Sequence, residues 1–201
     1  MLVTYNALLG LCEYERKWEV ALAIFETMRA RDVAPDAVTY NALVSTFEEC
    51  GEWEQATTWL ETALDAKMFN CFVGDGTVDL HHMRSPGTVQ TILRFYLRNL
   101  RTKALVDKQK LPRELKVITG WGRHSVVTGY SPVKERTVLL LQALNSPFLV
   151  PDNNPGLLVA EGDLVYKWLV KEEIVSLLRF VSGNGHAWRR NFSPETVDPS
   201  Q

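Results

Sequence analysis

The sequence predicts a two-part protein of the α+α/β class, in which an α-solenoid repeat pair of helical hairpins precedes a small α/β domain with a four-stranded mixed sheet. Two observations lead to this class. A pattern in the first 70 residues returns at a fixed spacing of 35 positions, which is typical of stacked helical repeats. Beyond it, short apolar runs alternate with longer helical patterns, which is typical of α/β architecture.

The repeat includes an identical hexapeptide, because the sequence V-T-Y-N-A-L at residues 3–8 recurs at residues 38–43. The spacing of apolar residues in the first unit predicts two helices, with one buried face formed by Leu8, Leu11 and Cys12 and the other by Val20, Ile24 and Met28. A single hairpin cannot bury such faces alone, so neighbouring units must stack. We expect the repeat part to span residues 2–70.

This unit resembles the pentatricopeptide family of RNA-binding repeats, which have 35 residues, open their first helix on V-T-Y-N and close on P-D, here Pro35-Asp36. The second unit departs from the pattern, because residues 68–71 replace its P-D close. A tetratricopeptide array is the rival interpretation, but its W-x-x-L-G-x-x-Y pattern is not found.

The resemblance implies a base-contacting pair in each repeat. In the first repeat this pair is Asn6 with Asp36, a combination that favours uridine in relatives. In the second repeat Asn41 would act with Cys71 or Asn70, an irregular combination without a clear preference. Single-stranded RNA is therefore the expected partner of the repeats, while DNA and protein partners stay open.

Composition adds two expectations. Residues 1–70 contain 5 Lys+Arg and 12 Asp+Glu, whereas residues 71–150 contain 12 and 5, within a chain of net charge −2. The basic block favours polyanion contact by the second part, while the acidic repeats leave open an adaptor that binds a basic protein. No run of about 18 apolar residues predicts a membrane span, and we expect no targeting segment in this chain because the repeat begins at once. The three cysteines lack C-x-x-C spacing, so we expect buried thiols.

The second part, residues 76–169, is predicted as an alternating series of elements. Ser85-Pro86 and Ser131-Pro132 are typical helix starts, since serine caps and proline suits the first helical position. The series comprises strand 77–81, helix 86 to about 106, strand 115–118, helix 132 to about 144, short strands 148–150 and 157–159, and a last helix from 163 to about 181. Residues 170–182 are thus a helical extension and residues 183–201 a loose tail.

Polar side chains follow the first two of these strands. In residues 78–81 the alternation of a strand places Val78 and Leu80 on one face, and Asp79 and His81 on the other. An Asp beside a His can orient its imidazole for acid–base chemistry, although a structural Asp beside a solvated His has the same spacing. The second strand is followed by the glycine-rich loop Thr119-Gly120-Trp121-Gly122-Arg123-His124. Its glycines allow the backbone to approach a ligand closely, although a flexible connection between a strand and a helix has the same composition.

A right-handed crossover makes the two strands parallel, so both motifs should meet at the carboxyl edge of the sheet, where ligands of open α/β sheets bind. A phosphate suits that edge, given Arg84, Arg123 and the two helix N-termini. A metal site of His81, His82 and His124 with Asp79 has no recognised zinc spacing, and we assign no metal ligands.

These two motifs, together with Asn154-Pro155-Gly156 further on, resemble the Smr (small MutS-related) domain over about residues 76–169. The resemblance implies nucleic-acid binding, with endonuclease activity in several members. The acidic and histidine positions map to Asp79 and His81, and the glycine loop to residues 119–122. His82 departs from the glycine that many stand-alone members have. Repeats followed by such a domain resemble organellar proteins of plants and algae, in the chloroplast or the mitochondrion.

The helix after the first motif carries a row of basic residues. Positions 94, 98 and 101 share a face by their spacing, and we expect phosphate contacts from Arg84, Arg94, Arg98, Arg101 and Lys103, although a solvated face has the same pattern. The resulting hypothesis is an organellar RNA-processing factor whose repeats bind RNA and whose α/β domain cleaves it. His81, oriented by Asp79, would act as acid or base, and the amides of Gly120–Gly122 with Arg123 would stabilise charge on the phosphate. A divalent ion, Mg²⁺ or Mn²⁺, is left open. The alternatives are a non-catalytic RNA-binding module and a protein-interaction adaptor.

Overall fold

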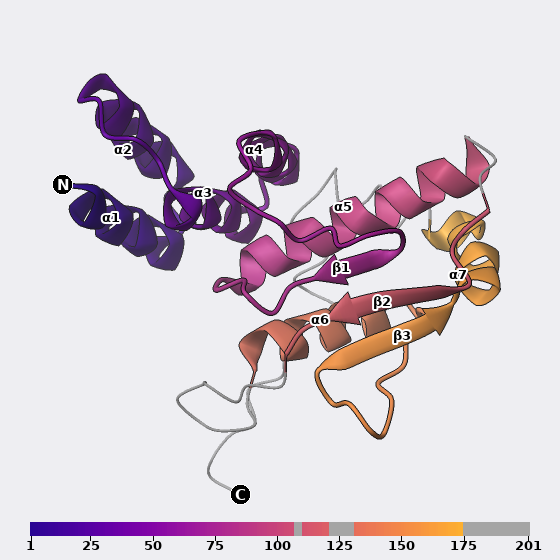
Figure 1. Cartoon of the computed structure of the whole chain (residues 1–201). Coiled ribbons are helices and arrows are strands. Elements are labelled where there is room, and N and C mark those ends of the chain that lie inside the picture. Colours follow the sequence, from indigo (N-terminus) through magenta and orange to yellow (C-terminus); the bar gives the residue numbers. More distant parts are fainter. Residues whose placement is uncertain (107–109, 121–130, 175–201) are drawn as a thin grey trace, which may run out of the picture.

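The computed structural model describes residues 1–106, 110–120 and 131–174. Its N-terminal part consists of two helical hairpins, α1 (Leu2–Glu15) with α2 (Trp18–Ala30) and α3 (Ala37–Cys50) with α4 (Trp53–Asp65) (Figure 1). The two turns inside the hairpins are equivalent, because Arg16 and Gly51 both end their helices in the left-handed conformation. Gly51 adopts that conformation without the cost that a side chain adds.

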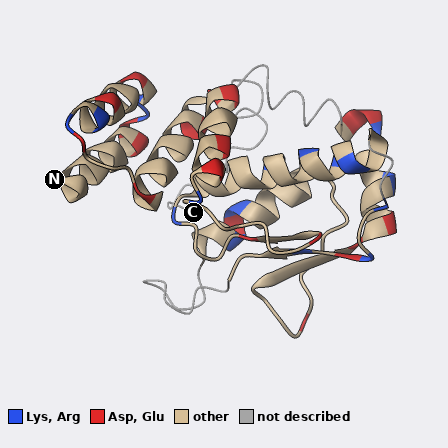
Figure 2. Ribbon diagram, turned by 45° about the horizontal axis from the view of Figure 1, so that its top comes forward, with Lys and Arg blue, Asp and Glu red and all other residues tan. Residues whose placement is uncertain are grey.

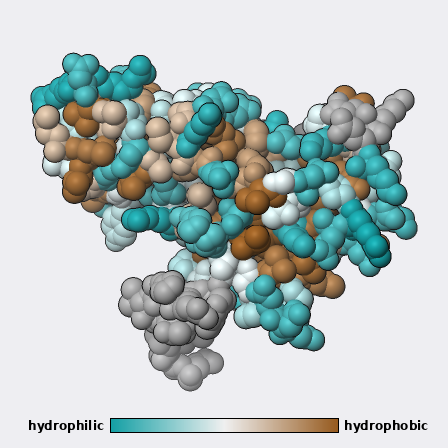
Figure 3. Space-filling model, in the orientation of Figure 1, coloured by the Kyte–Doolittle hydropathy of each residue, from teal (hydrophilic) through white to brown (hydrophobic). Residues whose placement is uncertain are grey.

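The buried faces of the first repeat differ from the predicted ones. Leu9 and Cys12 are buried in α1, whereas Leu8 is 43% and Leu11 56% exposed, and hydrophobic residues lie at the surface of this repeat (Figure 3). In the second repeat Leu43, the equivalent of Leu8, is fully buried. The reason is the number of neighbours, because α3 lies between α1 and α5, whereas among the described elements α1 packs mainly on α2 and α3.

The second part alternates strands and helices. Its elements are β1 (Thr77–Asp79), α5 (Pro86–Leu105), β2 (Glu114–Ile118), α6 (Pro132–Ala143), β3 (Leu157–Glu161) and α7 (Gly162–Leu169). β1 pairs in parallel with β2, and β2 pairs antiparallel with β3, so the sheet is mixed with the order β1-β2-β3. Val78, Leu115 and Val117 point into the core, which leaves Asp79 on the opposite face of the sheet.

One prediction about the sheet is wrong. Among the described residues the sheet has three strands and not four, because residues 148–150 contribute only an isolated bridge from Leu149 to Val159. Pro147 and Pro151 flank this segment, and a proline cannot donate to a ladder of strand hydrogen bonds. α7 ends at Leu169, whose carbonyl accepts a hydrogen bond from Arg101, so the expected helix is interrupted at residues 170–171. Residues 172–174 are again helical, and the remainder of the expected extension lies outside the described residues.

The two parts share one hydrophobic core. Tyr40, Val44 and Leu60 of the second repeat belong to the same buried cluster as Val89 and Leu93 of α5. α5 therefore lies between the repeats and the sheet (Figure 1). No helix in the described part of the chain is long and apolar enough to cross a membrane.

Candidate functional site

Asp79 and His81 form a directly bonded pair at the carboxyl end of β1. The Nδ1 atom of His81 lies 2.5 Å from the Oδ1 atom of Asp79, and the same oxygen accepts the backbone N–H of His81 at 3.1 Å. The His81 side chain is 39% and the Asp79 side chain 19% exposed. When a carboxylate accepts from Nδ1–H, the neutral ring keeps its lone pair on Nε2. The pair thus presents an oriented imidazole nitrogen at the surface.

Leu80 fixes the strand end that carries this pair. Its side chain is fully buried, and its N–H donates to the carbonyl of Ile118 in β2 at 2.7 Å. A turn follows, closed by the N–H of Met83 on the Leu80 carbonyl at 2.9 Å. His82 stays exposed in this turn, with its ring centroid 3.4 Å from that of His81. The chain therefore holds two neighbouring imidazoles on an anchored turn.

The end of β2 lies directly beside His81. Gly120 has a φ of +66°, and a Cβ atom added there would lie 3.3 Å from the Cβ of His81. The N–H groups of Thr119 and Gly120 both donate to the carbonyl of Gly156, at 2.9 and 3.2 Å. The structure thus brings the two sequence motifs together as far as Gly120. It corrects one expected role, because the Gly120 amide already has an acceptor and is not free for a phosphate.

Gly156 belongs to this site, although the sequence did not predict its contact with the end of β2. It accepts from Thr119 and Gly120, and its own N–H donates to Asn154 Oδ1 at 3.1 Å. The only sequence indication was the turn-forming Asn-Pro-Gly triplet, which predicts a turn but not what the turn touches.

The rest of the glycine loop, Trp121, Gly122, Arg123 and His124, lies outside the described residues. Over residues 1–106, 110–120 and 131–174, His, Cys, Asp and Glu side chains form no group of three that could hold a metal ion.

The five basic residues expected to contact phosphate fall into two groups. Arg84 and Arg98 are exposed, and so is Lys103, which lies 3.5 Å from Asp75. The expectation is wrong for Arg94, whose guanidinium is buried, and stays a prediction for Arg101, which is half-buried. Arg101 donates to the carbonyl of Leu169 at the end of α7, which is a favourable place for a cation.

Arg94 is buried in an ion pair with Glu48 of α3, with side-chain exposures of 6% and 3%. Glu48 also accepts from the hydroxyl of Thr91 at 2.8 Å, and the guanidinium lies 5.4 Å from the ring centre of Trp53. Burial raises the pKa of Glu48, while the positive charge of Arg94 opposes that rise. This arginine holds α5 against the second repeat and does not belong to a phosphate surface.

The first repeat places its expected base-contacting residues together. Asn6 Nδ2 donates to Asp36 Oδ1 at 3.1 Å, and Thr39 Oγ1 donates to Asn6 Oδ1 at 2.7 Å. Asp36 also caps α3 by accepting from the Thr39 N–H at 2.9 Å. Burial alone would raise the pKa of Asp36, but the hydrogen bonds from Thr39 and Asn6 lower it overall. Asn6 and Asp36 are half-buried, so their outer edges are open to a ligand.

The second repeat does not repeat this arrangement. Asn41 is only 9% exposed and donates to Ser85 Oγ at 2.7 Å, so the expectation that it acts with Cys71 or Asn70 is wrong. Cys71 is fully buried, and burial raises the pKa of its thiol to about 11. The start of α5 covers the position that would contact a base.

Comparison with known proteins agrees with the repeat geometry. Residues 2–56 match the PPR repeat family, PPR standing for pentatricopeptide repeat. The pentatricopeptide prediction is thereby confirmed for this stretch, and the two N-terminal helical hairpins are consistent with a pentatricopeptide solenoid.

Particular relatives extend the similarity. Two pentatricopeptide repeat-containing proteins of Arabidopsis thaliana are each 34% identical to the chain over 93 residues, which is 46% of this chain and 11% of the relative. A third from the same plant is 32% identical over 97 residues, which is 48% of this chain and 19% of the relative. These alignments are longer than the stretch 2–56, and the chain spans less than a fifth of the length of each relative.

Proposed function

We propose that the chain is an RNA-binding factor of a plant-type organelle, in which the repeats bind single-stranded RNA and the α/β part, an Smr-type domain, cleaves phosphodiester bonds. The observation that carries the proposal is the bonded pair of Asp79 and His81, exposed beside Gly120 at the carboxyl edge of two parallel strands. Ligands of open α/β sheets bind at that edge. The pentatricopeptide match and the Arabidopsis relatives support the RNA-binding half.

The chemistry follows from the orientation of His81. With Nδ1–H donated to Asp79, Nε2 is free to take a proton from a water molecule that attacks phosphorus. The bond from phosphorus to the leaving oxygen breaks, and the imidazolium returns the proton to that oxygen. Asp79 stabilises the imidazolium and keeps the ring oriented. Arg84, which is exposed three residues further on, supplies positive charge next to the phosphate.

The cleavage proposal is tested on the full chain with a labelled single-stranded RNA, with and without Mg²⁺ or Mn²⁺. His81→Ala should lower the rate by about 100-fold or more, the usual scale of acid–base catalysis, and Asp79→Asn should lower it as well. His82→Phe is the matched control, because it keeps a ring against His81 but has no titratable nitrogen, and it should retain most of the activity. Cleavage that survives His81→Ala and Asp79→Asn would come from a contaminating nuclease.

Base contact by the first repeat is tested separately. The Asn6–Asp36 pair should give tighter binding to oligo-U than to oligo-A, since each repeat of this type contacts one base through two or three side chains. Asn6→Ala should remove that preference while leaving the fold intact. Equal binding of both oligonucleotides by the parent chain would contradict the assignment.

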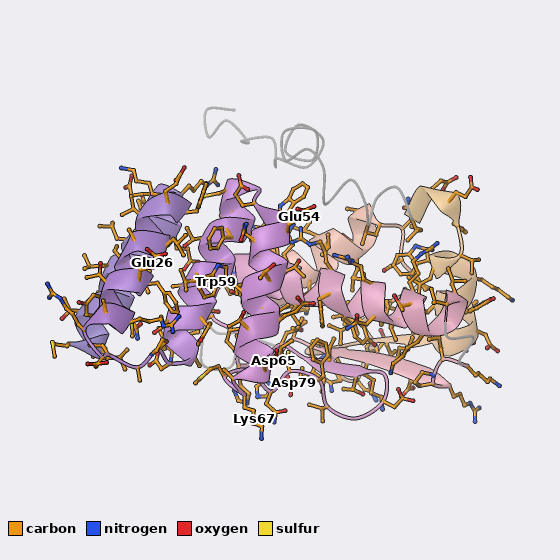
Figure 4. All side chains as sticks on the ribbon, turned by 90° about the horizontal axis from the view of Figure 1, so that it is seen from above. Glu26, Glu54, Trp59, Asp65, Lys67 and Asp79 are labelled. Atoms are coloured by element: carbon orange, nitrogen blue, oxygen red, sulfur yellow. The ribbon has the colours of Figure 1, made fainter. Side chains whose placement is uncertain are left out.

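Two other functions compete with this one. A non-catalytic RNA-binding module predicts binding without cleavage in every variant. A protein adaptor is favoured by the acidic side chains on the outer helices, where Glu26 lies on α2 and Glu54 and Asp65 lie near the two ends of α4 (Figure 4). Acidic residues are spread over both hairpins (Figure 2), so an adaptor of this kind should bind a basic protein on this surface. If the protein-binding and RNA-binding sites are separate, the basic protein should compete poorly with RNA.

A further inference from the structure

The contact between α1 and α3 is defined by two polar links. Asn6 of α1 donates to Asp36, the residue at which α3 is capped. Further along the two helices, the hydroxyl of Ser45 in α3 donates a hydrogen bond to the carboxylate of Glu13 in α1 at 2.7 Å. These two links mark the register in which α3 packs on α1, and the two helices run in parallel.

The contact between α3 and α5 contains the same two links. Asn41, 35 positions after Asn6, donates to Ser85, the residue before α5. Glu48, 35 positions after Glu13, accepts from Arg94 of α5. Ser85 stands 49 positions after Asp36, and Arg94 stands 49 positions after Ser45. Thus α5 packs on α3 in the register in which α3 packs on α1, and it takes the place of the first helix of a third repeat.

The side chain of Ser85 behaves accordingly. It stands at the N-cap of α5 but makes no capping hydrogen bond, whereas Asp36 and Ser131 both cap their helices. Its hydroxyl accepts from Asn41 and also hydrogen-bonds to Glu13. An N-cap serine normally stabilises its helix by bonding a first-turn amide, so the interaction with the repeats replaces an ordinary local bond. The sequence-based expectation that Ser85 caps the helix is therefore wrong.

A close approach of the backbones accompanies these bonds. A Cβ atom at Gly87 would lie 2.5 Å from Ser45 Oγ, so the first turn of α5 fits against α3 only with glycine there. Thr88 Oγ1 donates to the backbone carbonyl of Asn41 at 2.9 Å. The start of α5 is thus held by α3 through Ser85, Gly87 and Thr88 together.

We propose that Asn41 is a positioning residue that locks the loop carrying His81, and that the second repeat contacts no base through it. The loop between β1 and α5, residues 80–85, has one anchor at Leu80 in the sheet and the other at Ser85 on Asn41, and the exposed His81 and His82 lie between these anchors. The statement about base contact rests on the proposed function, whereas the statement about the loop does not. RNA leaving the Asn6–Asp36 position would meet the histidine loop as the next feature along the stacked helices.

The test compares Asn41→Ala, Ser85→Ala and Asn6→Ala in the full chain by hydrogen exchange and by the NMR signals of the His81 ring. Loss of a buried hydrogen bond costs about 1–3 kcal/mol, or about 5- to 150-fold in an equilibrium constant. Amides of residues 82–85 should therefore exchange about tenfold faster or more in Asn41→Ala and in Ser85→Ala. The His81 ring signals should shift in both. Asn6→Ala, the same change at the other junction, should alter neither.

The double variant Asn41→Ala with Ser85→Ala should exchange no faster than Ser85→Ala alone, because Ser85→Ala already removes the bond to Asn41 together with the one to Glu13. Binding to oligo-U and oligo-A gives the second arm, in which Asn41→Ala leaves the ratio of affinities unchanged while Asn6→Ala abolishes it. Unchanged exchange at 82–85 in both Asn41→Ala and Ser85→Ala overturns the proposal, and so does an altered base preference in Asn41→Ala. If the parent chain binds no RNA, the proposed function fails, while the exchange arm still decides the role of Asn41.

Discussion

Replacing Arg94 by methionine should strongly destabilise the chain. The methionine side chain still packs against Trp53 but carries no charge. The Glu48 carboxylate, whose side chain is only 3% exposed, then loses its ionic partner and keeps the hydrogen bond from the Thr91 hydroxyl at 2.8 Å. Removing one partner of a buried ion pair typically costs about 3–5 kcal/mol, because the other charge stays desolvated. For a chain of this size each kcal/mol lowers the melting temperature by about 2–4 °C, so a fall of about 6–20 °C is expected.

The assay is urea unfolding followed by tryptophan fluorescence and by circular dichroism. The control is the double variant Glu48→Met with Arg94→Met, which removes both charges. In it the Thr91 hydroxyl still has an acceptor, because it also donates to the carbonyl of Gly87 at 3.1 Å. Buried pairs replaced by apolar side chains of similar volume are often neutral or more stable, so the double variant should lie within about 1 kcal/mol of the parent or above it. A loss below about 1 kcal/mol in Arg94→Met would refute the burial of this pair.

Three further outcomes follow from the structure. Burial raises the pKa of Glu13, although the hydrogen bonds from Ser45 and Ser85 oppose that rise. The folded state therefore binds a proton at Glu13 more tightly than the unfolded state, and the free energy of unfolding falls as pH rises through the pKa of this carboxyl group. Glu13→Gln should be more stable than the parent at pH 7, and its stability should depend less on pH in unfolding experiments. Gly120→Ala should slow cleavage more than Gly74→Ala, because both glycines have positive φ but only at Gly120 would a Cβ lie near His81; equal activities would contradict the contact. Arg84→Gln and Arg98→Gln should each reduce the salt dependence of RNA binding by about 0.7 in log–log slope if the arginine contacts a phosphate, and an unchanged slope would remove that residue from the interface.

Local pattern was sufficient to predict the Asp79–His81 edge. Alternation along a strand and the handedness of the crossover do not depend on the rest of the chain, and they placed Asp79 and the end of β2 on the same side. The parallel pairing of β1 with β2 follows from the same rule. By contrast, the contact of Gly156 with Thr119 depends on a loop 37 positions away, for which no local pattern exists.

Contacts between distant elements account for the wrong expectations. Arg94, Arg98 and Arg101 have the spacing of a solvated helix face, and the sequence does not reveal that Glu48, 46 positions before Arg94, lies opposite one of them. Asn41 repeats Asn6 in the sequence, yet its neighbour is Ser85 and not a repeat-closing aspartate. In each case the residue type is compatible with two surroundings, and only the packing of α5 on α3 decides between them.

The most direct test of the central claim is the affinity of the full chain for a labelled single-stranded oligo-U, measured by fluorescence anisotropy between about 50 and 200 mM salt. The account predicts saturable binding that weakens steeply with salt, with a log–log slope of about −0.7 for each phosphate contacted. It also predicts weaker binding of oligo-A under the same conditions. The absence of saturable binding at the lowest salt, together with tight binding of a basic protein to the same chain, would contradict RNA as the ligand and favour the adaptor.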